Sequence, residues 1–160
     1  MSSADKVVDL ATLSRRVAAA RVAGRSVALA NGLFDVLHVG HLRYLEGAAR
    51  EASLLVVALN SDASARRLKG PSRPIVPQHE RAELVAGLAC VDYVTVFDED
   101  GAEAMLERLR PDVHCKGTDY TVDNVPEAPV ARALGIRIAI VGDAKAHATR
   151  DLIRRIRGGS

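Results

Sequence analysis

The chain has 160 residues, 48% of them apolar, which is enough for one domain to bury its own core. Its 22 basic and 20 acidic side chains leave a net charge of +2, and only 3% of residues are aromatic; this argues against a nucleic-acid-binding protein, and the absence of a long apolar run argues against a membrane protein. Two cysteines without metal-like spacing and a polar N-terminus without a signal-sequence core predict a cytoplasmic location.

Short apolar runs alternate with amphipathic stretches along the chain. The first amphipathic stretch carries Leu10, Leu13 and Val17 on one helical stripe and ends before Gly24. In chain order the sequence predicts a helix at 7–22, a strand at 26–30, a helix at 40–51, a strand at 53–59, a helix at 61–68, an irregular proline-rich loop at 69–77, a helix at 78–88, a strand at 93–97, a helix at 101–109, a strand at 113–116, a helix at 126–134, a strand at 137–141 and a helix at 149–157.

This alternation predicts an α/β fold, namely a single-domain, doubly wound, five-stranded parallel sheet of Rossmann-like type, because parallel strands need crossover connections. The second strand is apolar throughout, as expected where both faces of a sheet are covered. We expect one domain over 1–160, with an N-terminal helix at about 5–23 and a catalytic core at about 26–157. Ligands of such folds bind beyond the carboxyl ends of the strands, so the loops after the predicted strands are the places to search.

The loop after the first strand reads NGLFDVLHVGH, residues 31–41, and opens a helix. Gly32 permits a turn, and Gly40 lets a phosphate approach the backbone. His38 and His41 are three residues apart, so on a helix they share a face. A helix N-terminus offers unpaired N–H groups and the positive end of the dipole, and two imidazoles beside it can donate hydrogen bonds to the same anion. The pattern predicts a polyphosphate site rather than a metal site, which needs more ligands.

Each of these residues also has an ordinary explanation. A histidine near a helix start often bonds a backbone carbonyl, a glycine often makes a turn, and Asp35 can cap the helix. Their combination at one strand-to-helix junction favours the functional interpretation.

The run GLFDVLHVGH resembles the signature of the HxGH nucleotidyltransferases, which include cytidylyltransferases and phosphopantetheine adenylyltransferase. The further stretches VVALNSDASARRLKGPSRPIVP, ERAELVAGLACVDYVTVFDED and LRPDVHCKGTDYT are most similar to the bacterial D-glycero-β-D-manno-heptose 1-phosphate adenylyltransferases. This similarity covers the chain from about residue 26 to 156. It implies transfer of AMP from ATP to a heptose 1-phosphate, with release of pyrophosphate, by a homodimer or larger homo-oligomer.

The implied nucleophile is a phosphate oxygen that is already anionic, so the reaction needs positioning and charge stabilisation rather than a general base. By resemblance, His38 and His41 act on the phosphates, and Lys69, at the mouth of the proline-rich loop, reaches the β- and γ-phosphates, with Arg73 as a possible helper. A solvated lysine is the alternative for Lys69, and a surface ion pair is the alternative for Arg81. The expected nucleotide-binding residues are Asn31, Gly32, Phe34, Gly40, Arg81 and Thr149.

The sugar phosphate is expected to contact the loops after two other strands as well. Asp35 has two alternatives, which are to fix the turn or to help hold Mg²⁺; Mg²⁺ is expected mainly on the phosphates, with no site made by protein alone. The expected sugar-phosphate residues are Asp35, Asn60, Asp62, Lys116, Asp119 and Tyr120.

The run 147–150, His-Ala-Thr-Arg, departs from the Ser-Thr-Thr-like run that relatives carry before the last helix. Thr149 keeps a hydroxyl that can cap this helix and touch a phosphate, and Arg150 can supply a charge in place of a lost hydrogen bond. The tail arginines Arg154, Arg155 and Arg157 are interpreted as a solvated helix face.

Other functions remain open at this stage. One is a cytidylyltransferase acting on glycerol 3-phosphate or another small phosphate, another is a non-catalytic nucleotide sensor, and a third is an interaction module. The intact set of His38, Gly40, His41 and Lys69 argues against the sensor. The expected partners are therefore ATP and a sugar 1-phosphate, without nucleic acid or membrane.

Overall fold

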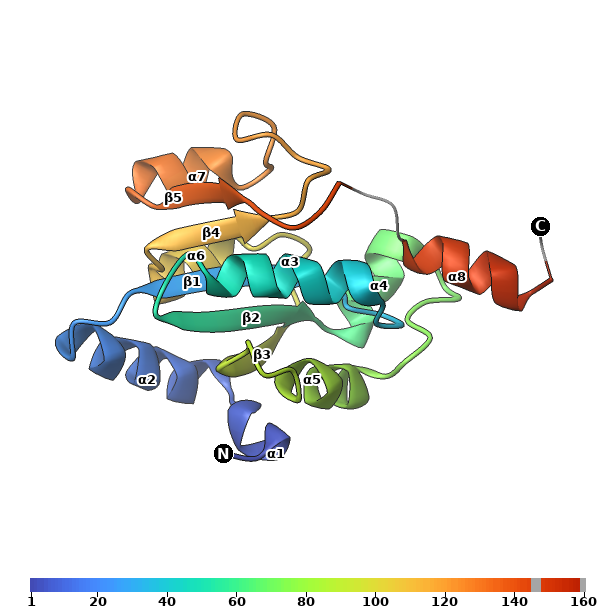
Figure 1. The fold of residues 1–160 in the computed structure, drawn as a ribbon, viewed down its shortest axis with the longest axis horizontal. Coiled ribbons are helices and arrows are strands. Elements are labelled where there is room, and N and C mark those ends of the chain that lie inside the picture. Colours follow the sequence, from blue (N-terminus) through green and yellow to red (C-terminus); the bar gives the residue numbers. More distant parts are fainter. Residues whose placement is uncertain (145–147, 159–160) are drawn as a thin grey trace.

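The computed structural model describes residues 1–144 and 148–158. Five strands form one parallel sheet in the order β3-β2-β1-β4-β5 (Figure 1). The strands are β1 (Val27–Gly32), β2 (Leu54–Asn60), β3 (Tyr93–Phe97), β4 (Val113–Lys116) and β5 (Arg137–Ile140). The chain builds outward from β1 to β3 and then returns to β4 on the other side of β1. The predicted doubly wound sheet is confirmed, and its topological switch point lies between β1 and β4.

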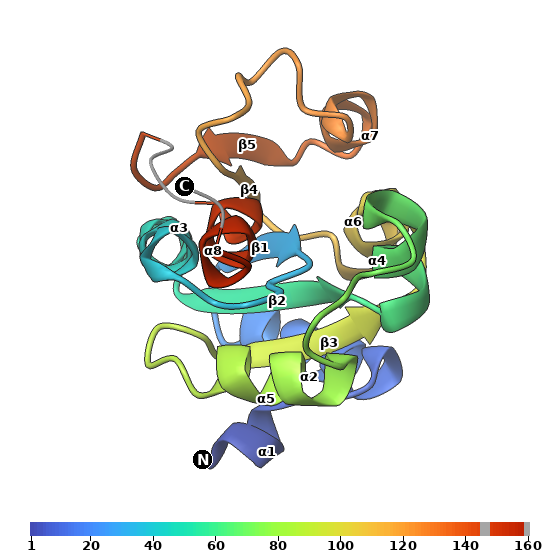
Figure 2. The same ribbon diagram turned by 90° about the vertical axis from the view of Figure 1, so that its right-hand side faces the viewer.

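Helices cover both faces of this sheet, as Figure 2 shows with α3 on one side and α6 and α7 on the other. The helices are α1 (Ser3–Lys6), α2 (Leu10–Val22), α3 (Val39–Ala49), α4 (Asp62–Lys69), α5 (Gln78–Ala86), α6 (Glu103–Leu109), α7 (Ala128–Ala133) and α8 (Thr149–Ile156). Among the described residues, no helix has both the length and the apolar character needed to cross a membrane.

Two hydrophobic clusters hold the layers together. Along β1, Ala28 and Ala30 pack into the cluster under α3 and α5, whereas Val27 and Leu29 pack into the one under α2, α6 and α7. Successive strand residues point to opposite faces, and both faces are covered. This accounts for apolar strands that lack a polar alternation.

The N-terminal segment differs from the single helix expected at 7–22. Val7 bridges to Val94 of the edge strand β3, and the Val8 amide donates to the Val94 carbonyl at 2.9 Å. Asp9 then caps α2 by accepting from the Thr12 amide at 2.7 Å. The helix is interrupted because these residues cover backbone groups at the sheet edge.

The first strand continues two residues beyond its expected end at Ala30, because Asn31 and Gly32 pair with Ala58 and Leu59 of β2. The turn expected at Gly32 occurs later, where Phe34 and Val36 have φ of 51° and 52°. Gly32 serves a different purpose: a Cβ there would lie 3.2 Å from the Phe34 ring, so the glycine makes room for that ring.

Candidate functional site

A cleft of about 470 Å³ opens beyond the carboxyl ends of β1 and β4, at the topological switch point. Its walls come from four segments: 33–44, the region of Lys69 and Arg73, residues 117–119 after β4, and residues 141–144 and 148–150 around the start of α8. The cleft therefore lies where this fold class binds its ligands. Gly142 helps close it, because φ is 95° there and a Cβ would meet the Tyr44 backbone at 3.2 Å.

The structure brings only part of the predicted site together in this cleft. The predicted residues that line it are Phe34, Asp35, His38, Gly40, His41, Lys69, Asp119 and Thr149. In the described part of the chain, the following predicted residues lie outside its lining: Asn31, Gly32, Asn60, Asp62, Arg81, Lys116 and Tyr120.

His38 and His41 orient each other through the first turn of α3. His38 is the N-cap residue, and its Nδ1 accepts from the Gly40 amide at 3.1 Å, while His41 Nδ1 accepts from the His38 amide at 3.2 Å. The two rings stack with centroids 3.9 Å apart. Because both Nδ1 atoms are acceptors, each neutral ring carries its proton on Nε2. The local backbone thus prepares two Nε2–H donors at the helix start.

The charge state of His41 is also set by its surroundings. Burial, and then the neighbouring His38, lower the pKa of His41 to about 4, so its ring is neutral near pH 7. The centroid of the Phe34 ring lies 5.5 Å from the centroid of the His41 ring and 6.4 Å from that of the Tyr44 ring. An imidazole in this setting donates a hydrogen bond without bringing a full charge of its own.

Asp35 is buried and connects three segments of the cleft wall. Its carboxylate accepts from Arg73 Nε at 2.7 Å and from the amides of Ile75 and Val76 at 2.8 and 2.9 Å. Its backbone carbonyl accepts from the Thr149 hydroxyl at 2.7 Å. The flanking left-handed residues Phe34 and Val36 turn the chain at this point.

Burial alone would raise the pKa of Asp35, but the bonds from Ile75, Val76 and Arg73 outweigh it and lower the pKa. The carboxylate is therefore charged and already has three donors. Asp35 lines the cleft, but these bonds go to protein groups, which differs from the expected contact with a sugar phosphate and from the alternative in which Asp35 fixes its own turn. The segment fixed by Asp35 is the proline-rich loop rather than its own turn.

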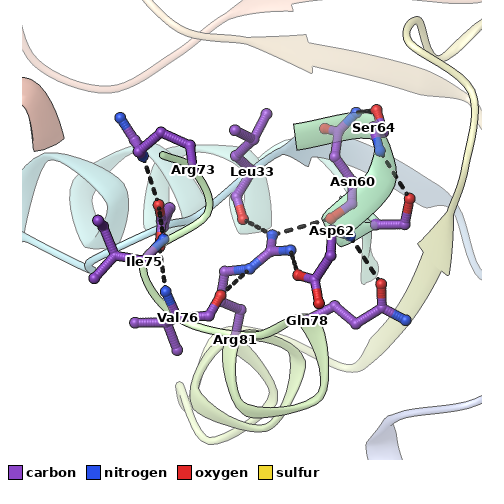
Figure 3. Close-up of polar contacts among 11 residues, drawn as sticks. Leu33, Asn60, Asp62, Ser64, Arg73, Ile75, Val76, Gln78 and Arg81 are labelled. Carbon is purple, nitrogen blue, oxygen red and sulfur yellow. Dashed lines mark hydrogen bonds and ion pairs between the residues drawn. The ribbon is translucent and has the colours of Figure 1, made fainter. Parts of the chain in front are cut away.

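Arg81 was expected at the nucleotide, with a surface ion pair as the alternative, but the structure buries it outside the lining of the cleft. Its side chain has 0% exposure. The guanidinium donates to the carbonyls of Leu33, Asn60 and Val76 and to Asp62 Oδ1 at 2.9 Å (Figure 3). One sequence signal indicates this burial: Arg81 stands four residues before Val85, on the same buried face of α5.

The same cluster corrects two sugar-phosphate predictions. The Asp62 carboxylate pairs with Arg81, and the Asn60 amide donates to Ser64 Oγ at 2.9 Å. Both side chains hold the end of β2 to α4 and α5. They shape the wall behind the cleft instead of facing a substrate.

Some side chains of the segment after β4 line the cleft, and others point away from it. Lys116 is nearly buried, with Nζ 3.8 Å from Glu127 Oε2 and 4.8 Å from the centre of the Tyr120 ring. Thr118 and Asp119 line the cleft, and the Thr118 hydroxyl donates to the Asp143 carbonyl at 2.6 Å. In this conformation Lys116 and Tyr120 contact each other and do not face the cleft, contrary to their predicted role.

The side chain of Asn31 is fixed by a hydrogen bond with His114 of the neighbouring strand β4. Asn31 Oδ1 lies 3.0 Å from His114 Nε2, and burial lowers the pKa of His114 to about 3. The neutral imidazole therefore donates to Asn31. Neither residue was expected to act on the other, because 83 positions separate them.

The start of α8 also differs from its expected form. Ala148 is the N-cap residue, and its methyl group cannot accept a hydrogen bond. The Thr149 hydroxyl bonds the Asp35 carbonyl instead of capping the helix. Arg150 lines the cleft, and His147 lies outside the described residues.

Several cleft residues were missed by the sequence reasoning. Tyr44 follows His41 by one helical turn, and its hydroxyl donates to the Cys115 carbonyl at 2.7 Å. Asp143 follows β5 and pairs with Arg43 at 2.6 Å. Helical spacing from His41 could have revealed Tyr44, whereas the bridge between Asp143 and Arg43 joins two distant segments and leaves no local signal.

Three cations, Lys69, Arg73 and Arg150, line the cleft together with the carboxylates of Asp35, Asp119 and Asp143. Lys69 is the last residue of α4, and Gly70 ends that helix with φ of 101°. Within the described residues, no group of three or more His, Cys, Asp or Glu side chains can hold a metal ion. The arrangement can bind a chain of phosphates, because imidazole donors and cations line the same cleft.

Comparison with known proteins gives a consistent result. The cytidylyltransferase-like family pattern matches residues 29–150. The chain is 47% identical over 133 residues to the "Bifunctional protein HldE" of Syntrophotalea carbinolica, covering 83% of this chain and 27% of that protein. The protein of the same name from Mesorhizobium japonicum is 46% identical and is matched over 98% of this chain and 32% of its own length. The chain thus spans about a third of the length of the curated relatives it matches.

Among solved structures, the "lipopolysaccharide core biosynthesis protein" from Thermoplasma volcanium is similar, with a TM-score of 0.64 and 25% identity, over 76% of this chain and 99% of that one. The family match includes the second half of β1, the paired histidines, the proline-rich loop and the start of α8. The chain therefore belongs to the cytidylyltransferase-like family, in agreement with its resemblance to the HxGH nucleotidyltransferases.

Proposed function

We propose that the protein is an adenylyltransferase that transfers AMP from ATP to a heptose 1-phosphate, forming ADP-heptose and pyrophosphate. The observation that carries the proposal is the reciprocal pair of imidazoles at the start of α3, at the switch point, in a cleft that three cations also line. Support for the heptose acceptor comes from the sequence similarity to heptose 1-phosphate adenylyltransferases over nearly the whole chain.

In this reaction an oxygen of the sugar 1-phosphate attacks the α-phosphorus of ATP. The bond from that phosphorus to the bridging oxygen of the β-phosphate breaks, and its electron pair leaves with pyrophosphate. The attacking oxygen carries no proton to remove, so a general base is unnecessary. The residues have to align the two phosphates and stabilise the charge that develops between them.

The two Nε2–H groups of His38 and His41 suit the α-phosphate, where negative charge increases in the transition state. Lys69, Arg73 and Arg150 suit the departing pyrophosphate. Asp35 acts on the reaction indirectly, because it holds Arg73 and the loop that follows Lys69.

We also propose that Mg²⁺ enters with ATP. Of the carboxylates that line the cleft, Asp35 and Asp143 are already paired with Arg73 and Arg43, which fits a metal carried by phosphates and water rather than by a protein cage. When bound, Mg²⁺ neutralises part of the phosphate charge. Treatment with EDTA is expected to abolish pyrophosphate release, and added Mg²⁺ is expected to restore it.

Two further expectations belong to this proposal. We place the reaction in the cytoplasm, where ATP is available and where Cys90 and Cys115, both free thiols in the structure, remain reduced.

We expect a homodimer or larger homo-oligomer. Light scattering after size-exclusion chromatography measures its mass, and a monomer at micromolar concentration would contradict this expectation.

The deciding experiment measures pyrophosphate release with each of ATP, CTP, GTP and UTP. Each nucleotide is paired with the α- and β-anomers of heptose 1-phosphate and with glycerol 3-phosphate. We expect release with ATP and a heptose 1-phosphate, and its loss in His41→Ala. The family description favours one rival, a cytidylyltransferase, and release only with CTP would replace the proposal with it. Nucleotide binding without release from any pair would instead indicate a sensor.

A further inference from the structure

A second cleft of about 410 Å³ lies between α8 and the proline-rich loop. Among the described residues, all charged side chains in its lining are cations: Lys69, Arg73, Arg150, Arg154 and Arg157. Ile75 and Ile153 supply an apolar part of the wall. Clustered like charges repel one another unless an anion compensates them, so this lining favours an anionic ligand.

The lining residues of α8 form one helical face. Arg150, Ile153, Arg154 and Arg157 have the spacing i, i+3, i+4, i+7, which places them along one stripe. Of the described arginines of α8, Arg155 is outside the lining of both clefts. The tail arginines Arg154, Arg155 and Arg157 are all exposed, as the sequence predicts, but only Arg154 and Arg157 line this cleft.

Both walls of this cleft are bonded to Asp35. Arg73 and Ile75 bond Asp35, and Thr149 bonds the Asp35 carbonyl at the start of α8. The Arg73 contact uses one of the five N–H donors of its guanidinium. Arg154 contacts Asp151 at 3.3 Å, but both side chains are exposed, at 66% and 45%, so an anion can displace this weak pair.

The second cleft is continuous with the first. Lys69, Arg73 and Arg150 line both of them. With a rise of 1.5 Å per residue, the stripe from Arg150 to Arg157 extends about 10 Å away from the paired histidines. An anion that is bound to the three shared cations can therefore also reach Arg154 and Arg157 only if it is long.

We propose that this second cleft binds linear inorganic oligophosphates, with two phosphate groups on the shared cations and additional groups on Arg154 and Arg157. The proposal rests on the proposed function only in placing pyrophosphate at the shared cations. Affinity rises with chain length, and an oligophosphate of three or four groups competes with ATP. The terminal phosphates of ATP itself are the alternative occupant.

Isothermal titration calorimetry tests this with pyrophosphate, tripolyphosphate and tetrapolyphosphate at constant ionic strength without Mg²⁺. In the unmodified protein we expect tetrapolyphosphate to bind about tenfold more tightly than pyrophosphate, as two additional charge-assisted contacts permit. In Arg154→Gln/Arg157→Gln this gain is lost, while pyrophosphate binding changes less than about twofold. Arg21→Gln/Arg155→Gln removes the same charge outside both clefts and keeps the gain.

Equal affinity for all three chain lengths would overturn the proposal. An equal loss in the Arg21→Gln/Arg155→Gln control would also overturn it, since net charge would then explain the effect. A KM for ATP that rises in Arg154→Gln/Arg157→Gln as much as the Kd for tetrapolyphosphate would assign the cleft to the nucleotide tail. These binding measurements need no turnover, so failure of the proposed adenylyl transfer leaves them interpretable.

Discussion

His41 has two separable tasks at its two ring nitrogens. Nδ1 accepts from the His38 amide and stabilises the first turn of α3, while Nε2 carries the donor that we assign to the α-phosphate. An asparagine side chain can place an oxygen near the position of Nδ1 but has nothing at Nε2. Substitution can therefore separate the two tasks.

For His41→Asn we expect kcat to fall by about 10²–10³, the usual effect of removing one transition-state donor. The free energy of unfolding is expected to fall by less than about 1 kcal/mol, because the cap is kept. Steady-state kinetics and urea unfolding measure both quantities. His41→Ala serves as the comparison, since it loses both tasks, and an asparagine variant with unchanged kcat would remove His41 from the chemistry.

Asp35 shows how one buried carboxylate can control a loop 40 residues away. In Asp35→Asn the new side-chain amide is neutral and no longer balances the Arg73 charge. Its NH₂ group also replaces an acceptor oxygen beside three hydrogen-bond donors. We expect the free energy of unfolding to fall by about 3 kcal/mol. We also expect KM for ATP to rise at least about tenfold, because Arg73 and the proline-rich loop lose their fixed positions.

The matched control is Asp143→Asn, whose partner Arg43 is about half exposed. That exposed pair contributes at most about 1 kcal/mol. Urea unfolding compares the two variants, and a similar small loss in both would show that Asp35 does not hold the loop.

At the level of elements, Arg81 joins α5 to the ends of β1 and β2. The guanidinium fork bonds three carbonyls and Asp62 at once, a geometry that the single ammonium group of lysine does not reproduce. A structural role and a nucleotide-binding role therefore predict different results for the same substitution.

For Arg81→Lys we expect the free energy of unfolding to fall by about 3 kcal/mol, because buried carbonyls lose their donors. KM for ATP is expected to change less than about threefold, as for a residue without substrate contact. Thermal unfolding and kinetics below the transition give both values. Arg67→Lys, whose pair with Asp100 is exposed, controls for the chemistry of the substitution; a raised KM with unchanged stability would restore the nucleotide-binding role.

At the level of the whole molecule, two buried histidines couple stability to pH. Their pKa values in the folded protein are about 4 for His41 and about 3 for His114, below the unfolded value of 6.5. Between these values the unfolded chain binds more protons than the folded one. The contribution of these two neutral histidines to the free energy of unfolding is therefore complete above pH 6.5. The free energy of unfolding is expected to fall as the pH decreases from 6.5 toward 4.

Urea unfolding at intervals from pH 7.5 to pH 4.5 measures this decline. His114→Gln keeps an amide that can bond Asn31 but does not titrate, so its decline with decreasing pH is expected to be shallower than that of the unmodified protein. Identical slopes for the two proteins would show that His114 does not titrate with folding.

The sequence by itself determined the order in which strands and helices follow one another along the chain, and it placed the paired histidines at the start of a helix. Both are local properties: periodicity follows from the backbone geometry of each element, and the HxGH run forms its cap within four residues. Strand ends such as that of β1 moved by two residues, because pairing with β2 decided them.

The tertiary structure alone decided which polar side chains face the cleft. The carboxylate of Asp35, the guanidinium of Arg81 and the ammonium group of Lys116 are all directed by partners on other segments. A sequence shows that such a residue follows a strand or opens a helix. Whether it bonds a substrate or a buried backbone group depends on which distant groups would otherwise lack a partner, and only packing brings those groups together.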